Sequence, residues 1–169
     1  MVTAQEFAQT WHRVLFEEDM TQTWQGMTKE FRRIVAQVAL GKAKTRGEDV
    51  DSTVEALSEA VPAHPDVREF FSAACTILQR ACGAHPDSVG AGVTTRVEAP
   101  AYEVVRLYVL DDLSTDADGH GYLPPGESAR ALTLITSAEP STSWQMAGIG
   151  RVMTTGWPPT VLWEPPPEV

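Results

Sequence analysis

The segment YEVVRLYVL, residues 102–110, is the clearest β-strand in the chain and decides the class of fold. Strand side chains alternate between two faces, so one face is expected to carry Tyr102, Val104, Arg106, Tyr108 and Leu110, and the other Glu103, Val105, Leu107 and Val109. Both faces are mostly apolar, whereas a sheet with one wet face shows a cleaner alternation. We therefore expect helices of the chain to cover one side of this sheet, and a partner or a tail to cover the other.

Further strands are predicted around this segment. Apolar and polar residues alternate over 89–97, and two more runs typical of strands cover 129–137 (ARALTLITS) and 143–153 (SWQMAGIGRVM). The short connection AEPST between these two runs predicts a hairpin. We interpret the Asp-, Gly- and Pro-rich segment 111–128 as a long loop.

The first half of the chain has the spacing of helices. Apolar residues that recur at i, i+4, i+7 and i+8 predict a first helix over about residues 3–17. Asp19 fits the N-cap of a second helix, which should stop before Gly41 and be interrupted near Gly26 and Thr28.

Two more helices are predicted before the strands begin. Ser52 and Glu55 have the spacing of a capping box, which predicts a short helix through about Ala60. Pro65 fits the first position of a longer helix, and Gly83 fits its C-terminal stop. Helices first and strands second predict an α+β fold.

The charge of the chain limits its partners. The 169 residues include 13 Lys and Arg against 23 Asp and Glu, a formal net charge of −10. A surface this acidic repels phosphate backbones and anionic lipid headgroups. We therefore expect neither nucleic acid nor a membrane surface as a partner.

The N-terminus and the cysteines bear on where the protein works. The sequence opens without a basic start followed by an apolar block, so no signal peptide is predicted, and no apolar run approaches the ~20 residues that span a bilayer. Cys75 and Cys82 lie about 10 Å apart along a predicted helix, too far for a disulfide, and their spacing is not a zinc pattern. We interpret them as small core residues of a cytoplasmic protein.

Two places in the sequence carry a resemblance to a known family. Trp11 precedes the turn at Glu17–Asp19 and Trp24 follows it, and the last hairpin, ALTLITSAEPSTSWQMAGIG, has a Trp that opens its final strand. These features resemble the cone-shaped NTF2-like superfamily, which includes SnoaL-like polyketide cyclases and ketosteroid isomerases. The Gly-Trp-Pro-Pro of residues 156–159 looks like the tails of uncharacterised actinobacterial members.

The element order and the resemblance together suggest a domain organisation. We expect one α+β domain over residues 1–155, with N-terminal helices packed on a curved antiparallel sheet, and a Pro-rich tail over 156–169. The resemblance implies a pocket inside the cone, lined by apolar and aromatic residues. Its lining candidates are Trp24, Phe31, Tyr102, Tyr108 and Trp144. The alternative is that these are ordinary core aromatics without a ligand.

Three residues are weak catalytic candidates. Arg106 is the one charge on an otherwise apolar strand face; it fits an anchor for a carboxylate or phosphate, an ion pair with Glu98 or Glu103, or an edge position in water. Glu103 and Glu98 would suit a general base if buried, since burial raises the pKa of a carboxyl group. His12 lies beside Trp11 and is placed at a pocket mouth.

Metal and cofactor sites are not expected. The histidines lack metal-ligand spacing. The loop that begins at Asp116 does follow a calcium-loop template, with acids at positions 1 and 3, a Gly at 6 and Glu127 at 12. However, His120 at position 5 is a poor ligand for a hard cation, and the flanks are predicted strands where the template needs helices. We expect a solvated hairpin loop and keep Asp116, Asp118 and Glu127 as the calcium candidates.

Three functions follow from these observations. The first is a non-catalytic homodimer, paired through the open sheet face, that binds a small apolar molecule or a protein partner; no position matches a catalytic Asp or Tyr of the isomerases. The alternative is a cofactor-independent cyclase, isomerase or dehydratase that acts on a small apolar substrate in the cone pocket. The third is a subunit whose Pro-rich tail docks on a partner, although the same tail could pack on its own domain.

Overall fold

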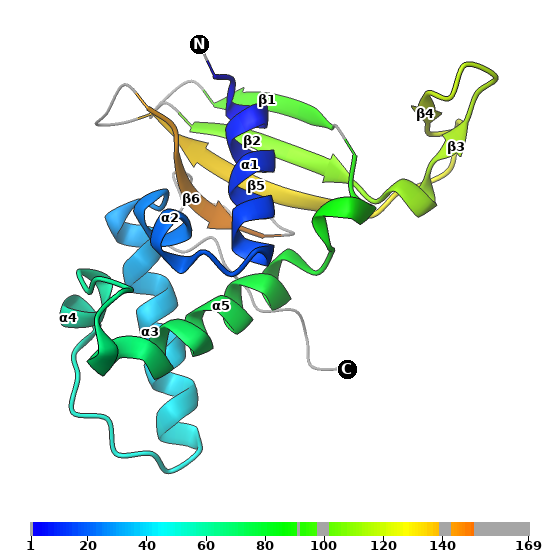
Figure 1. The fold of residues 1–169 in the computed structure, drawn as a ribbon. Helices are drawn as coiled ribbons and strands as arrows, with labels where there is room; N and C mark the ends of the chain where they lie inside the picture. Colours follow the sequence, from blue (N-terminus) through cyan, green and yellow to red (C-terminus); the bar gives the residue numbers. More distant parts are fainter. Residues whose placement is uncertain (1, 91, 98–101, 139–142, 151–169) are drawn as a thin grey trace.

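The computed structural model describes residues 2–90, 92–97, 102–138 and 143–150, with helices in the first half and antiparallel strands in the second (Figure 1). The helices are α1 (Ala4–Phe16), α2 (Met20–Gln25), α3 (Lys29–Thr45), α4 (Val54–Ser58) and α5 (Arg68–Cys82). The strands are β1 (Val93–Val97), β2 (Tyr102–Tyr108), β3 (Ser114–Thr115), β4 (Gly121–Tyr122), β5 (Ala131–Ser137) and β6 (Gln145–Ile149). The α+β class is confirmed. Glu98, the tail 156–169 and the last residues of the final predicted strand lie outside the described residues.

Side-chain caps set where the first helices begin. The Asp19 carboxylate accepts the Gln22 N–H at 3.0 Å, and the Thr28 hydroxyl accepts the Phe31 N–H at 3.2 Å. These two caps confirm the predicted start at Asp19 and the predicted interruption between α2 and α3. The predicted stop before Gly41 was wrong, because α3 continues to Thr45. A helical Gly costs only about 1 kcal/mol, and α3 buries apolar residues on both sides of Gly41.

The later helices follow the prediction with small shifts. The N-cap of α4 is Thr53 and not Ser52, since the Thr53 hydroxyl accepts the Ala56 N–H at 3.1 Å. Pro65 opens a 3-10 turn that leads into α5. The predicted stop at Gly83 is confirmed: its φ of +66° is the left-handed conformation that glycine adopts without a steric cost.

The main sheet has the strand order β1-β2-β5-β6, and all of its neighbours are antiparallel. Between β2 and β5 the chain leaves this sheet, in the segment that we expected to be a loop. There β3 pairs with β4 in a separate two-stranded hairpin that projects away from the rest of the molecule (Figure 1). We call residues 110–128 the hairpin arm.

The core lies between the helices and one face of the main sheet. Helix α1 crosses β2 and β5, and α3 packs against β6 (Figure 1). Val105 and Leu107 of β2 point into this core, which confirms the alternation predicted for 102–110. Val104 and Ile135 form a separate buried cluster on the opposite face. On the face that we expected a partner or a tail to cover, these two residues are therefore already buried in the single chain.

Within the described part of the chain, no helix is both long enough and apolar enough to cross a bilayer.

Candidate functional site

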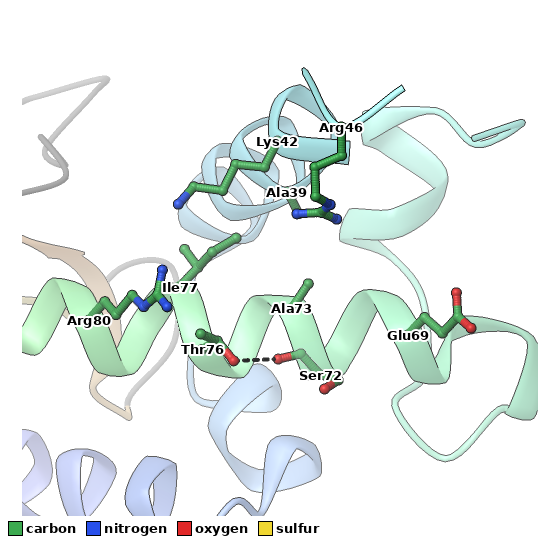
Figure 2. Close-up of a pocket in the computed structure, with 9 residues that line it drawn as sticks. All are labelled: Ala39, Lys42, Arg46, Glu69, Ser72, Ala73, Thr76, Ile77 and Arg80. Carbon is green, nitrogen blue, oxygen red and sulfur yellow. Dashed lines mark hydrogen bonds between the residues drawn. The ribbon is translucent and has the colours of Figure 1, made fainter. Parts of the chain in front are cut away.

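A hollow lined by residues of two helices lies between α3 and α5. It has a volume of about 420 Å³ (Figure 2). Its floor is apolar, and its rim carries three cations; the floor residues are Ala39, Ala73 and Ile77, and the cations are Lys42, Arg46 and Arg80. We call this hollow the α3–α5 groove.

The helical period places these residues on two facing surfaces. Ala73, Ile77 and Arg80 lie at i, i+4 and i+7 along α5, so they share one face of that helix. Ala39 and Lys42 lie three residues apart on α3, and Figure 2 shows Lys42 reaching from α3 toward α5. The two alanines have short side chains and leave the space above Ile77 unfilled.

The charge of the groove runs against that of the chain. Lys42 and Arg80 form no ion pair with any described residue, whereas the Arg46 Nη2 donates to the Glu48 Oε2 at 3.0 Å. The single acid of the lining, Glu69, lies eleven residues before Arg80 on α5, about 16 Å along the helix axis. Figure 2 shows the two at opposite ends of the groove. One end of the groove is therefore a cationic site in a protein with a net charge of −10.

Helix ends explain only part of this arrangement. Lys42 belongs to the last turn of α3 and Arg80 to the last turn of α5. Cations are favoured there because the C-terminal carbonyls of a helix carry partial negative charge. That preference is satisfied by any direction of the side chain around the helix, so it does not account for both cations lining the same hollow.

The three predicted catalytic residues do not converge. His12 is fully buried, its Nε2–H donates to the Ala84 carbonyl at 3.0 Å, and burial lowers its pKa to about 4. Glu103 shares the helix-facing side of β2 with Val105, whereas Arg106 lies on the opposite side. The two charged candidates therefore cannot serve one pocket on either face of the sheet.

Arg106 lines a second hollow, of about 430 Å³, at the end of the sheet. It forms no ion pair with a described residue, Glu103 included. The same hollow is lined by Gly83 and Ala84, which follow the C-terminus of α5.

The five aromatic candidates for a cone pocket are distributed over the molecule. Trp24 and Phe31 are buried in the core, where the Trp24 ring meets Phe71 edge-on with ring centroids 5.1 Å apart. Tyr102 and Tyr108 lie on the opposite side of β2. The Trp144 indole packs against the edge of the core, and its Nε1–H donates to the Val2 carbonyl at 3.0 Å.

The calcium candidates lie in the hairpin arm. Asp116, Asp118 and His120 each place a ligand atom within 4.8 Å of the others, and all three are exposed; Glu127 is not in this group. The Asp116 Oδ1 accepts the N–H groups of Asp118 at 2.9 Å and of His120 at 2.8 Å. These bonds close the turn at the tip of the arm and explain an aspartate at position 116 without an ion.

The base of the arm is fixed by a charged fork. The Asp112 Oδ1 and Oδ2 accept hydrogen bonds from the Arg130 Nη2 and Nε, both at 2.8 Å, and this pairing lowers the pKa of Asp112 to about 2. Beyond the fork, Tyr122 is 50% exposed and Leu123 is 40% exposed. The arm is thus a held hairpin that displays apolar side chains to solvent.

Sequence reasoning did not find the α3–α5 groove. Neither Lys42 nor Arg80 is singled out by the sequence. The available signal was a helical spacing that joins alanines to cations on two different helices, but no sequence pattern says that two such faces meet. Searches with family models, among curated proteins and among solved structures gave no match to this chain.

Proposed function

We propose that this chain is a non-catalytic binding protein, and that its α3–α5 groove binds an acidic segment of a protein partner. The observation that carries the proposal is the convergence of Lys42 and Arg80, both without an ion pair to a described residue, on an apolar floor in a strongly acidic chain. Carboxylates complement the rim, and small or flat apolar side chains complement Ala39, Ala73 and Ile77.

The exposure of the lining favours a protein segment over a small molecule. Only Ala39 and Ile77 of the lining are buried, while Arg46, Glu69, Ser72, Thr76 and Arg80 are exposed. Pockets for small molecules enclose most of the ligand surface. An open groove of this kind instead suits an extended or hairpin segment that stays attached to a larger partner.

The dispersal of the catalytic candidates supports binding over catalysis. The buried His12 donates its hydrogen bond to the Ala84 carbonyl, and Glu103 and Arg106 lie on opposite sides of β2. A kinship with NTF2-like proteins remains part of the proposal; the order of helices before an antiparallel sheet supports it.

The proposal is tested with a fluorescein-labelled peptide in which Asp-Tyr-Glu-Leu is repeated three times. We expect its fluorescence anisotropy to rise on titration with the wild-type chain. The double variant Lys42→Glu/Arg80→Glu should raise the dissociation constant roughly tenfold or more, which corresponds to about 1.4 kcal/mol. The matched control is Lys44→Glu/Arg13→Glu, which makes the same change in net charge at the last turns of α3 and α1.

The control separates the groove from the charge of the whole chain. Lys44 and Arg13 are exposed and do not line the groove. The control variant should therefore change the dissociation constant less than roughly twofold, because neither side chain lines the groove and both are exposed to screening by salt. Equal losses in the two variants, or no binding of the peptide by the wild type, would contradict the proposal.

A further inference from the structure

We infer that the partner of the α3–α5 groove is a second copy of this chain, which inserts its hairpin arm. This inference rests on the proposed function, since it names the acidic segment that the groove binds. It places the contact between copies at the arm and the groove, and not at the sheet face on which Val104 and Ile135 are already buried.

The arm has the chemistry that the groove requires. Residues 110–128 contain five acids, Asp111, Asp112, Asp116, Asp118 and Glu127, and no Lys or Arg. Asp112 is paired with Arg130, and the carboxylates of Asp118 and Glu127 are exposed. The apolar part is supplied by Tyr122 and Leu123, which are the exposed large apolar residues of β4 and its end.

The order of the arm favours binding without a large entropic cost. The Asp112–Arg130 fork holds its base, and the hydrogen bonds of Asp116 close its tip. A segment that is already a hairpin loses less conformational freedom when it docks than a disordered one. Docking would remove the exposed Tyr122 and Leu123 side chains from water. This burial supplies a hydrophobic driving force in addition to the charge pairing.

Charge determines the pairing between copies. Two molecules with a net charge of −10 repel each other unless a cationic surface of one meets an acidic surface of the other. The groove supplies Lys42 and Arg80 for the acids of the arm. The arm projects from the sheet away from α3 and α5 of its own chain, so the two surfaces are free to meet between molecules (Figure 1). Reciprocal use of the two surfaces closes a dimer, and one-sided use extends a chain of copies.

The test is a charge swap followed by sedimentation velocity of the full chain. One variant reverses the groove (Lys42→Glu/Arg80→Glu) and another reverses the arm (Asp118→Lys/Glu127→Lys). Asp116 is kept because its carboxylate closes the tip of the arm. The wild type should show a sedimentation coefficient that rises with concentration, and each variant alone should sediment as a monomer. An equimolar mixture of the two should recover association, because the reversed arm now matches the reversed groove.

Two further variants check the contact. Tyr122→Ser/Leu123→Ser removes the exposed apolar side chains and should raise the dissociation constant of self-association roughly tenfold. Glu17→Lys/Asp51→Lys changes two exposed acids outside the arm and should leave self-association intact. Circular dichroism of each variant verifies that the fold is retained.

The outcomes separate this inference from the proposed function. A wild type that stays monomeric at every concentration, or a mixture that fails to recover association, would overturn the arm-in-groove contact. The peptide titration needs no second copy, so peptide binding by a monomeric wild type would leave the groove as an acidic-segment site with a different partner. Loss of peptide binding together with a monomeric wild type would remove both.

Discussion

The two sides of helix α5 differ in packing: one side is buried in the core, and the other lines an open groove. Toward the core, Phe71 and Leu78 are buried, and Phe71 meets the edge of the Trp24 ring. Toward α3, the same helix presents Ala73 and Arg80 to an open groove. Close packing of aromatic rings on one side stabilises the fold, whereas short side chains on the other leave a space with a charged rim. The core-facing side of α5 therefore stabilises the fold, and the groove-facing side is available for binding. Substitutions on one side should affect stability, and substitutions on the other should affect binding.

The largest effect is expected on the core side, at Trp24. This side chain is 1% exposed, so Trp24→Ala should lower the free energy of unfolding by about 3–5 kcal/mol through lost burial and a cavity. Trp24→Phe should lose less than half as much, because the Trp24 Nε1 has no hydrogen-bond partner among the described residues and its removal breaks no such bond. Urea unfolding followed by circular dichroism measures both. If Trp24→Ala lowered the free energy of unfolding by less than about 1 kcal/mol, the core-facing side of α5 would not be the side that stabilises the fold.

A smaller effect on the free energy of unfolding is expected when the pH is lowered, because His12 is buried. Its pKa is about 4 in the folded chain against an ordinary value of 6.5, because burial penalises the charged ring. The unfolded chain therefore binds more protons between these values, and the free energy of unfolding should fall by roughly 3 kcal/mol as the pH drops from about 6.5 to about 4.

The His12 prediction is measured by comparing variants at each pH. His12→Gln keeps a donor for the Ala84 carbonyl but does not titrate, so its free energy of unfolding should depend less on pH over this window than that of the wild type. The exposed His64 provides the control, and His64→Gln should track the wild type. Parallel curves for all three proteins would show that burial of His12 does not carry the effect.

The smallest effect is expected on the groove side. Lys42→Gln/Arg80→Gln should change the free energy of unfolding by no more than about 1 kcal/mol, since each cation loses only its interaction with a helix end. The pair Lys44→Gln/Arg13→Gln should lose the same amount, because these residues occupy equivalent last turns. Thermal unfolding of the two variants compares them directly. A clearly larger loss at the groove pair would mean that the groove cations support the fold itself.

Much of the local structure could be predicted from the residues. The caps at Asp19 and Thr28 and the stop at Gly83 were confirmed, because each depends on a bond or a backbone angle within a few residues. The N-cap at Thr53 was missed by one residue, since Ser52 and Thr53 are chemically equivalent caps. The segment of the arm was predicted as a solvated hairpin loop, but its strands β3 and β4 were not predicted, because they span only two residues each and leave no periodic signal.

Less of the candidate site could be predicted from the sequence. The alternation of Glu103 and Arg106 across β2 was predicted, but both were still considered for one site, because the sequence does not say which face meets the helices. The aromatic candidates were chosen by residue type, and the packing of Trp24 against Phe71 depends on contacts between distant segments. The groove needs α3 and α5 to lie side by side, a relation that neither helix encodes alone.

The sequence by itself determined the order of the helices and the main strands, several helix ends and the acidic charge, because these follow from spacing, short-range hydrogen bonds and composition. Only the tertiary structure decided where the charges act. Packing brought Lys42 and Arg80 to one groove, put Arg106 in a hollow beside the C-terminal end of α5, and let Asp112 and Arg130 hold the arm outward. Each of these joins residues far apart in the chain, and such pairs are chosen by the packing of whole elements and not by local preference.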